Sequence, residues 1–394
     1  MEFPKKGNRT RMINITEFCT GCRACEQSCT HHAIYMAESD EGFLTAKITL
    51  DKCVDCGLCH KICPQNKPLV KNFPRKVLGA RLKDDVLLYQ SASGGAFAGI
   101  AEEWIKSGGV VFGVQYDSKW NAHHICVKTI DELEHVLSSK YVQADTRNSY
   151  SEVKRYIRAG IPVLYCGTGC QIGGLKAFLK KDYDNLLTID LICHGVSSPL
   201  LFRQYIAWLE NLKEAPIREY DFRDKHFGWG LNYKYKYKNK IKYKSCIIDP
   251  YYYRFLEGHT YRECCYQCQY CTPKRIGDIT IGDYWGIEKE HPSFFSSKGV
   301  SCVLINSDKG ENAWKKYNSF FYTIETTFEQ VARHNGNLLH PTNRDSLVRD
   351  HIYDGIHTPH WFSDVFVASF KPPLSTQIKS LVPLWAKILI KKFF

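Results

Sequence analysis

The chain has 394 residues, with 53 Lys and Arg against 41 Asp and Glu, so its formal charge is +12. This length allows two or three domains, and 44% apolar residues suit packed cores. No apolar run reaches the roughly 18 residues of a membrane-spanning helix, which excludes one. The cationic surplus favours acidic partners but does not choose among a protein, a nucleotide and an anionic membrane.

Two cysteine runs near the N-terminus share the spacing C-x2-C-x2-C-x3-C. A 4Fe-4S cluster needs four thiolates, and in two-cluster ferredoxins the last cysteine of each run ligates the other run's cluster. The spacing therefore predicts two crossed ligand sets. One set is Cys19, Cys22, Cys25 and Cys63, and the other is Cys53, Cys56, Cys59 and Cys29.

Two other uses of these cysteines are less favoured. A disulfide framework needs an oxidising compartment and a signal peptide, but residues 1–12 are charged and contain no apolar segment. Zinc is the stronger alternative, although structural zinc uses paired C-x2-C knuckles, which the triplets fit poorly. Pro64 after Cys63 completes the ferredoxin signature, whereas Thr30 stands at the matching place in the first run. The unpaired thiols predict a reducing, oxygen-poor cytoplasm.

From Leu78 onwards, short apolar runs alternate with helical patterns, which is typical of parallel strands joined by crossover helices. The loop 91–95, SASGG, opens an apolar helix that Gly108 and Gly109 end before a strand over 110–114. Backbone amides at such a helix start form a seat for an anion.

Two later strands each lead through a cysteine-containing loop into a helix. The strand 161–165 is followed by the loop 166–170, CGTGC, and a helix over 171–181. The strand 186–192 is followed by Cys193 and His194, and Ser198 is expected to cap the next helix. Because ligands bind at the carboxyl edge of such sheets, the two loops predict a site. Glycine-rich turns without ligands and buried structural cysteines are the alternatives.

Residues 233–244, YKYKYKNKIKYK, alternate strictly and reverse near Asn239, which predicts a β-hairpin. We expect its tyrosines and Ile241 on one face and its six lysines on the other. The lysine face could dock an acidic electron-transfer partner, but a solvated face that protects a sheet edge is favoured. No recognised nucleic-acid-binding motif accompanies it.

A second cluster of cysteines lies at residues 264–271 and comprises Cys264, Cys265, Cys268 and Cys271. These thiols suit a third iron-sulfur cluster or a zinc ion. A site made of these four alone is cramped because two of them are adjacent, so Cys170 and Cys193 are expected to contribute. Residues 381–394 mix apolar residues with lysines, and docking on the protein's own core is favoured over membrane contact.

Seven ordered motifs resemble the coenzyme F420 hydrogenase/dehydrogenase beta subunit family along nearly the whole chain. They are SASGGAFAGIAE, SKYVQAD, CGTGCQIGGLKAFL, IDLICHGVSSP, FRDK at 222–225, CYQC and DITIGDYWG at 278–286. The resemblance implies FAD and 4Fe-4S clusters, with electrons passing between the clusters and an organic acceptor through the flavin. It places the flavin at Ser93, Gly94, Gly95, Lys140, Thr168 and Gln171.

The resemblance also implies a possible additional 4Fe-4S cluster on Cys170, Cys193, Cys265 and Cys268. Cys264 and Cys271 are extra and could replace some of these ligands. Gly169 stands where the family usually has proline, which is expected to loosen the turn. His194 is the candidate proton donor beside the flavin, and a helix-cap or core histidine is an equal alternative.

The sequence therefore predicts an α+β protein. A small two-cluster ferredoxin-like domain covers 1–72, a larger α/β flavin-binding domain with a mixed sheet covers 73–345 with a division near 215, and a C-terminal tail covers 346–394. The expected function is that of a cytoplasmic FAD-dependent iron-sulfur oxidoreductase that takes electrons from ferredoxin or another redox protein and acts on a small organic substrate. The alternatives are a non-catalytic electron-relay subunit and, least favoured, a zinc-dependent nucleic-acid binder. Membrane contact is expected to be at most peripheral, through the tail.

Overall fold

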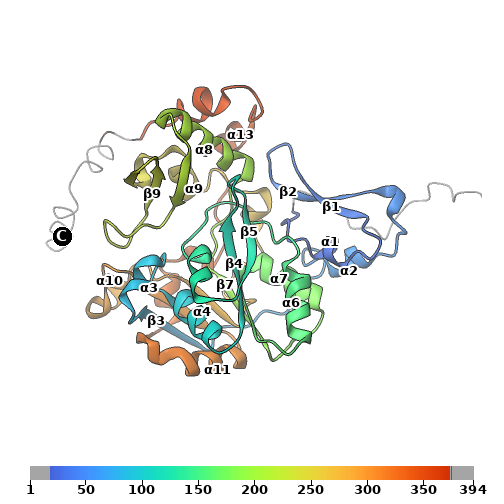
Figure 1. Ribbon diagram of the computed structural model, residues 1–394, viewed down its shortest axis with the longest axis vertical. Helices are drawn as coiled ribbons and strands as arrows, with labels where there is room; N and C mark the ends of the chain where they lie inside the picture. Colours follow the sequence, from blue (N-terminus) through green and yellow to red (C-terminus); the bar gives the residue numbers. More distant parts are fainter. Residues whose placement is uncertain (1–17, 373, 375–394) are drawn as a thin grey trace, which may run out of the picture.

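The computed structural model describes residues 18–372 and 374. A small N-terminal domain lies beside a larger body (Figure 1). It contains the antiparallel strands β1 (Ile34–Glu38) and β2 (Leu44–Ile48) and the short helices α1 (Ala24–Ser28) and α2 (Leu58–Ile62). Residues 381–394, for which core docking was predicted, lie outside the described residues, as do residues 1–17.

The body is built on one eight-stranded sheet with the order β13-β3-β12-β11-β7-β6-β4-β5. The strands β4, β6, β7 and β11 run parallel to one another, and the remaining pairings are antiparallel, so the predicted mixed sheet is confirmed. The bounds are β3 (Lys76–Leu82), β4 (Val110–Tyr116), β5 (Ala122–Val127), β6 (Val163–Thr168), β7 (Leu186–Leu191), β11 (Ile279–Asp283), β12 (Ser301–Ile305) and β13 (Phe321–Thr326).

Helices cover both faces of this sheet. Apolar side chains of α4 and α11 pack on one face, and those of α6 and α7 pack on the other, as a buried parallel sheet requires. The helices of the body are α3 (Asp85–Gln90), α4 (Ala96–Lys106), α5 (Ile130–Leu133), α6 (Ser149–Arg158), α7 (Gly169–Leu179), α8 (Pro199–Lys213), α9 (Pro250–Leu256), α10 (Ile287–Glu290), α11 (Asp308–Tyr317), α12 (Phe328–Ala332) and α13 (Ser346–Tyr353).

The predicted strand-to-helix units are confirmed. Helix α7 begins at Gly169, two residues before the predicted start, because Thr168 and Gln171 form a capping box that satisfies the first free amides. The hydroxyl of Ser198 accepts from the amide of Leu201 and caps α8, with Pro199 in the first turn, as the sequence predicts.

Short turns of 3-10 or π type complete the described chain. They are η1 (Leu50–Lys52), η2 (Glu134–Val136), η3 (Cys246–Ile248), η4 (Glu263–Gln267), η5 (Pro292–Phe294), η6 (Asn318–Phe320), η7 (Gly336–Leu338) and the π turn η8 (Phe362–Val367). Aromatic side chains of α13 and η8 pack with α8 and α9 in a second hydrophobic core. The first part of the predicted tail is therefore integral to the body.

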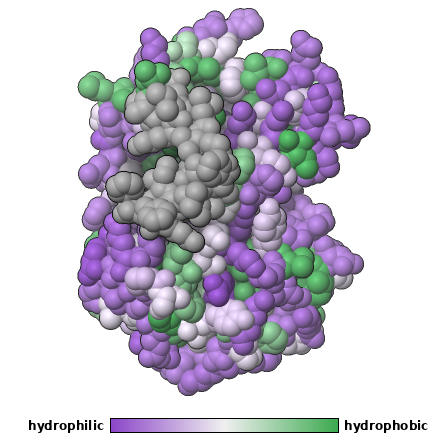
Figure 2. All heavy atoms as spheres, turned by 90° about the vertical axis from the view of Figure 1, so that its left-hand side faces the viewer, coloured by the Kyte–Doolittle hydropathy of each residue, from purple (hydrophilic) through white to green (hydrophobic). Residues whose placement is uncertain are grey.

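A three-stranded sheet of order β10-β9-β8 contains β8 (Ile217–Asp221), β9 (Asn232–Tyr237) and β10 (Lys240–Ser245). The predicted hairpin is confirmed, but the expected separation of its faces is wrong. Tyr233 pairs with Lys244 and Tyr235 pairs with Lys242. Because the turn has two residues, each tyrosine of β9 lies opposite a lysine of β10, and paired residues point to the same face of the sheet. Lysines therefore occur on both faces. The side of the molecule that carries the hairpin is largely hydrophilic where described residues are visible (Figure 2).

The N-terminal domain is tied to the body by polar contacts at its cysteine loops. Arg262 donates from Nε to the carbonyl of Cys19 at 2.6 Å and from Nη1 to the carbonyl of Leu44 at 2.8 Å. Arg23 is paired with Asp145, with Nη2 to Oδ2 at 2.8 Å. These contacts fix the cysteine loops against the elements that lead to the sheet edge. No helix in the described part of the chain is long and apolar enough to cross a bilayer.

Candidate functional site

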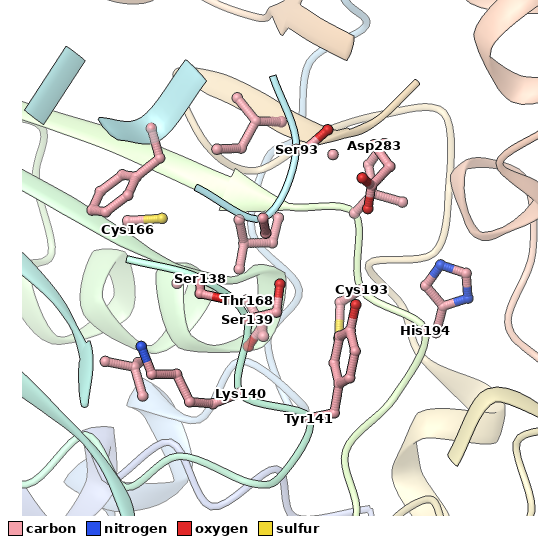
Figure 3. Close-up of a pocket in the computed structure, with 18 of the residues that line it drawn as sticks. Ser93, Ser138, Ser139, Lys140, Tyr141, Cys166, Thr168, Cys193, His194 and Asp283 are labelled. Atoms are coloured by element: carbon pink, nitrogen blue, oxygen red, sulfur yellow. The ribbon is translucent and has the colours of Figure 1, made fainter. Parts of the chain in front are cut away.

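A cavity of about 460 Å³ opens at the carboxyl edge of the parallel strands β6 and β7 (Figure 3). This volume lies within the roughly 300–1,000 Å³ typical of small-molecule sites. Its walls come from the loop before α4, residues 136–142, the ends of β6 and β11, and the loop after β7. The predicted site at this sheet edge therefore coincides with a cavity, because parallel strands bring their following loops to the same edge.

Five of the six residues predicted to hold flavin line this cavity: Ser93, Gly95, Lys140, Thr168 and Gln171. Gly94 does not line it. A Cβ at Gly94 would lie 2.2 Å from the carbonyl oxygen of Ala80 and 2.3 Å from the amide nitrogen of Ser301. The glycine at 94 is therefore explained by close packing against β3 and β12.

The loop before α4 is anchored by a buried lysine. Lys225 donates from Nζ to the carbonyls of Leu88 at 2.6 Å and Ser93 at 2.5 Å. Burial lowers the pKa of Lys225 to about 7, and the charge of Arg223 acts in the same direction. The hydroxyl of Ser93 donates to the carbonyl of Val300 at 2.9 Å. The FRDK motif thus holds the SASGG loop in place.

Asp283, which lines the cavity, is held in a buried ion pair. Arg223 binds Asp283 through two bonds of 2.6 and 2.7 Å, and Trp229 donates to the same carboxylate at 2.7 Å. Burial raises the pKa of Asp283, but the charge and hydrogen bonds of Arg223 outweigh it and leave the pKa below its usual range. Arg223 also donates to the hydroxyl of Tyr141 at 3.1 Å. Trp285 lines the cavity and is stacked on Trp229 at 5.0 Å.

Lys140 is a half-buried lysine in the segment 136–142 of the cavity wall. It donates from Nζ to the carbonyls of Leu137 at 2.6 Å and His135 at 3.3 Å. Burial lowers its pKa to about 8, and the opposing charge of Asp221 only partly offsets this. Its charge is therefore sensitive to pH just above neutrality.

Thr168 and Gln171 are engaged with each other at the start of α7. The amide of Thr168 donates to Oε1 of Gln171 at 2.9 Å, and the side-chain amide of Gln171 donates to the carbonyl of Ala144 at 3.1 Å.

His194 lies on the loop after β7 next to Cys193, and both line the cavity (Figure 3). His194 is exposed to solvent, but desolvation by the protein atoms around its imidazole lowers its pKa, against the charge of Asp283.

The predicted cluster cysteines gather around two small cavities in the N-terminal domain. The proximal set surrounds a cavity of about 40 Å³ and consists of Cys19, Cys22, Cys25 and Cys63. The distal set surrounds a cavity of about 30 Å³ and consists of Cys29, Cys53, Cys56 and Cys59. The last cysteine of each run thus lies with the other run, which is the arrangement that a two-cluster ferredoxin needs.

Among residues 18–372 and 374, no group of three or more His, Cys, Asp and Glu side chains could hold a single metal ion. A cubane keeps its thiolates further apart than one ion does, because four irons and four sulfides lie between them. The absence of a single-ion site among these residues is therefore compatible with cluster binding by the proximal and distal sets.

A second cysteine group lies between the N-terminal domain and the large cavity. It consists of Cys170, Cys193, Cys264, Cys265, Cys268 and Cys271. Burial and the nearby Cys268 raise the pKa of Cys170 and of Cys193, whereas hydrogen bonds from Cys271 and backbone amides lower that of Cys268 to about 6. The Cys271 thiol donates to the carbonyl of Cys193 at 3.5 Å. All four predicted ligands and both extra cysteines are therefore neighbours.

Helix α7 and Tyr270 separate this group from the proximal set. A Cβ at Gly169 would lie 2.8 Å from Cβ of Tyr270, and one at Gly173 would lie 2.1 Å from its hydroxyl oxygen. A Cβ at Gly174 would lie 3.0 Å from Sγ of Cys22. Gly169 was expected to loosen the turn. The turn is instead capped, and the glycine admits the ring of Tyr270.

The sequence motifs FRDK and DYWG pointed to important segments without assigning roles to Arg223, Lys225 or Asp283. For Asp283 the signal was a carboxylate within the apolar segment 279–285, since buried charges are rare unless they are paired. Arg223 and Lys225 lie in the charged segment 218–226, which gave no such signal. Their partners lie far away in the sequence, so only the folded chain reveals them.

The cysteine sets and the cavity define an iron-sulfur protein whose N-terminal domain is joined to an α/β body. Comparison with protein families agrees: residues 18–67 match the 4Fe-4S dicluster domain, which holds two 4Fe-4S clusters. Residues 162–327 match the family described as the C terminus of the beta subunit of coenzyme F420 hydrogenase/dehydrogenase. Residues 162–327 are therefore similar to the C-terminal part of the beta subunits of that family, residues 18–67 form a 4Fe-4S dicluster domain, and the chain is an electron-transferring redox protein.

Among solved structures, the chain is similar to one from the F420-reducing NiFe hydrogenase complex of Methanosarcina barkeri. The two are 16% identical, the match covers 66% of this chain and 84% of that chain, and the TM-score is 0.44. A search of curated proteins found no match.

Proposed function

We propose that the chain is an FAD-dependent iron-sulfur oxidoreductase. The observation that carries the proposal is the continuous series from the distal set through the proximal set and the second cysteine group to Cys193 on the wall of the large cavity. Electrons then travel between the clusters and a small organic substrate at the cavity. A ferredoxin or another redox protein supplies them. We place the protein in the reducing cytoplasm of an organism that lives without oxygen, because free cysteine thiols stay reduced there.

The cavity residues fit a flavin. Its lining is largely apolar, with polar atoms from Ser93, Thr168 and Lys140 at separate points, as expected where a planar ring and a phosphate-bearing tail are held together. The Gly-containing start of α4 offers backbone amides to an anion. When bound, FAD supplies the exchange between one-electron and two-electron transfer that links clusters to an organic substrate.

The remaining roles belong to this chain's own side chains. Lys225 and the Arg223–Asp283 pair keep the loops of the cavity wall in position. His194 is the proposed proton donor because it lines the cavity beside Cys193. Cys170, Cys193, Cys265 and Cys268 are proposed to hold an additional 4Fe-4S cluster, with Cys264 and Cys271 as neighbouring thiols.

Anaerobic purification, followed by reconstitution with iron, sulfide and FAD, tests the proposal. We expect one FAD per chain and about eight irons, or about twelve with the additional cluster. Ala92→Trp, in the cavity wall, should abolish flavin binding, whereas Ala159→Trp, at the exposed end of α6, should leave it unchanged. Protein that holds its clusters but no flavin would contradict the proposal and indicate an electron-relay subunit.

A further inference from the structure

Lys71 is a half-buried cation beside the second cysteine group. It lies in the segment between the N-terminal domain and β3, and its Nζ donates to the carbonyl of Gln269, which stands between Cys268 and Cys271 in the chain. The same ammonium lies 5.5 Å from the ring centre of Tyr270. Lys71 is therefore held against the loop that carries these cysteines.

The positive charge of Lys71 is not neutralised by an acid. Within the part of the chain that the structure describes, no carboxylate forms an ion pair with it. Arg275 also lies near Cys268, but its charge is matched by the buried Asp190. A half-buried charge without a counter-charge is costly, so the position of Lys71 favours an anion nearby.

The nearest source of negative charge is the second cysteine group. Burial lowers the pKa of Lys71, and the charge of Cys268 opposes this effect. No cysteine of the described proximal set acts on Lys71 to a comparable degree. The charge of Lys71 is therefore directed at one of the two neighbouring cysteine sets.

The two sets are nevertheless linked through Gln269. Its side-chain amide donates to the carbonyl of Pro64 at 3.0 Å, and Pro64 directly follows Cys63 of the proximal set. The loop of the second group is thus hydrogen-bonded to the loop of the proximal set. An electron that crosses between the sets passes close to this link.

Arg262 is a second cation without a carboxylate partner among the described residues, but it is shared between the sets. It donates to the carbonyl of Cys19 in the proximal set, and its charge also acts on Cys264. A charge that acts on both sets changes both reduction potentials in the same direction. Lys71 acts on the second group alone and can therefore separate the two potentials.

We propose that the ammonium of Lys71 holds the reduction potential of the second cysteine group above that of the proximal set, which directs electrons toward the cavity. The inference rests on the proposed function, in which the second group holds an additional 4Fe-4S cluster. One electron leaves the proximal set and is taken up at the second group, and no bond or proton is transferred. The added negative charge arrives beside Lys71, which stabilises it, because net charge near an iron-sulfur cluster sets its potential.

A redox titration of the anaerobic, reconstituted holoprotein, followed by electron paramagnetic resonance, tests the inference. Lys71→Met should lower the potential of the second group relative to the proximal set. The equilibrium constant for transfer between them should fall at least ~10-fold, which is about 59 mV for one electron. Lys71→Arg should keep the wild-type potential, because arginine stays charged.

Lys274→Met is the matched control. It removes the same charge from an exposed lysine, which stands over the ring of Phe73 at 5.1 Å, and solvent and salt screen such a charge. Its potentials should match the wild type. Lys71→Gln keeps a hydrogen-bond donor at position 71 and should shift the potential as Lys71→Met does, whereas a shift in Lys71→Met alone would assign the effect to the lost hydrogen bond and overturn the inference.

The signal of the second group is identified as the one that Cys268→Ala loses, and iron analysis accompanies each titration. About twelve irons with an unchanged potential in Lys71→Met, or an equal shift in Lys274→Met, would overturn the inference and leave the proposed function in place. About eight irons in the wild type would overturn it together with the additional cluster. Protein without flavin would contradict the proposed function but would not alter the comparison of potentials.

Discussion

At the scale of single residues, this protein uses buried charges to fix the walls of a cavity. Lys225 donates to the carbonyl of Leu88 in α3 and to that of Ser93 in the loop that follows, and Arg223 is matched by Asp283 with both carboxylate oxygens engaged. Burying an unpaired charge costs several kcal/mol, whereas a charge with full hydrogen bonds is tolerated and specifies one arrangement. The cavity therefore keeps its shape through polar contacts as well as apolar packing.

Lys140 leads to a prediction about pH. Burial lowers its pKa from an ordinary value of 10.5 to about 8. In the proposed flavin site, the ammonium is charged below pH 8 and is expected to attract an anionic group of FAD, and above pH 8 this attraction is expected to be lost. The affinity for FAD should therefore be constant below pH 8 and fall above it, by at most ~10-fold per pH unit.

Flavin titrations from roughly pH 6 to 10 measure this dependence. Lys140→Arg should keep the affinity high across the range, because arginine stays charged. Lys140→Met should bind weakly at every pH. If Lys140→Met shows the same fall above pH 8 as the wild type, another group is responsible.

At the scale of elements, helix α7 connects the N-terminal clusters to the cavity. Thr168 caps its start, Cys170 lies in its first turn, and its glycines bring Tyr270 and Cys22 into direct contact with the helix backbone. Burial raises the pKa of Tyr270, and the neighbouring Cys170 and Cys22 act in the same direction, which places the ring between the second cysteine group and the proximal set. A helix with larger residues at these positions would hold the two sets further apart.

Gly173→Ala tests this role of the helix. In a helix interior this change usually stabilises by about 0.5–1 kcal/mol. Here a Cβ would lie 2.1 Å from the hydroxyl oxygen of Tyr270, so we expect a loss of about 1–3 kcal/mol in the free energy of unfolding. Urea unfolding of the anaerobic holoprotein measures it.

Tyr270→Leu supplies the matched control, because a shorter side chain leaves room for the new methyl group. The double variant should lose less stability than the sum of the two single variants. Additive losses would show that Gly173 and Tyr270 do not constrain each other.

At the scale of the whole molecule, the N-terminal domain is held on the body by arginines. Arg349 binds Glu41 with Nη2 to Oε2 at 2.6 Å, Arg203 binds Glu38 at 2.8 Å, and Arg262 binds two carbonyls of the cysteine loop and β2. Arg262 is 3% exposed, whereas Arg203 lies at a more exposed rim. Arg262 should therefore contribute more than Arg203 to the free energy that holds the N-terminal domain on the body.

Arg262→Met is expected to loosen the domain and slow electron delivery to the cavity by roughly 10-fold or more, because two buried carbonyls lose their donor. Arg203→Met should have little effect, as exposed ion pairs contribute about 0–1 kcal/mol. Hydrogen exchange over residues 18–67 and stopped-flow flavin reduction after dithionite measure the two effects. Equal protection and equal rates in both variants would contradict this assignment.

Much of the fold was predictable from the sequence. The parallel strands that end at Thr168 and Leu191, and the helices that follow them, were recognisable from buried apolar runs and from Ser198 and Pro199 as start signals. The hairpin was found, but its faces were assigned wrongly. The alternation of side chains along each strand was predicted correctly. The prediction did not take into account that a two-residue turn places the tyrosines of one strand opposite the lysines of the other.

The sequence by itself determined that this protein carries two iron-sulfur clusters, because the ligands of each cluster lie mostly within one short loop whose spacing is local information. Only the tertiary structure decided what lies between the clusters and the cavity. The packing of Tyr270 on the glycines of α7, the hold of Lys225 on Ser93 and the pairing of Arg223 with Asp283 join segments far apart in the chain. Such contacts depend on how the elements pack, and spacing along the sequence does not encode them.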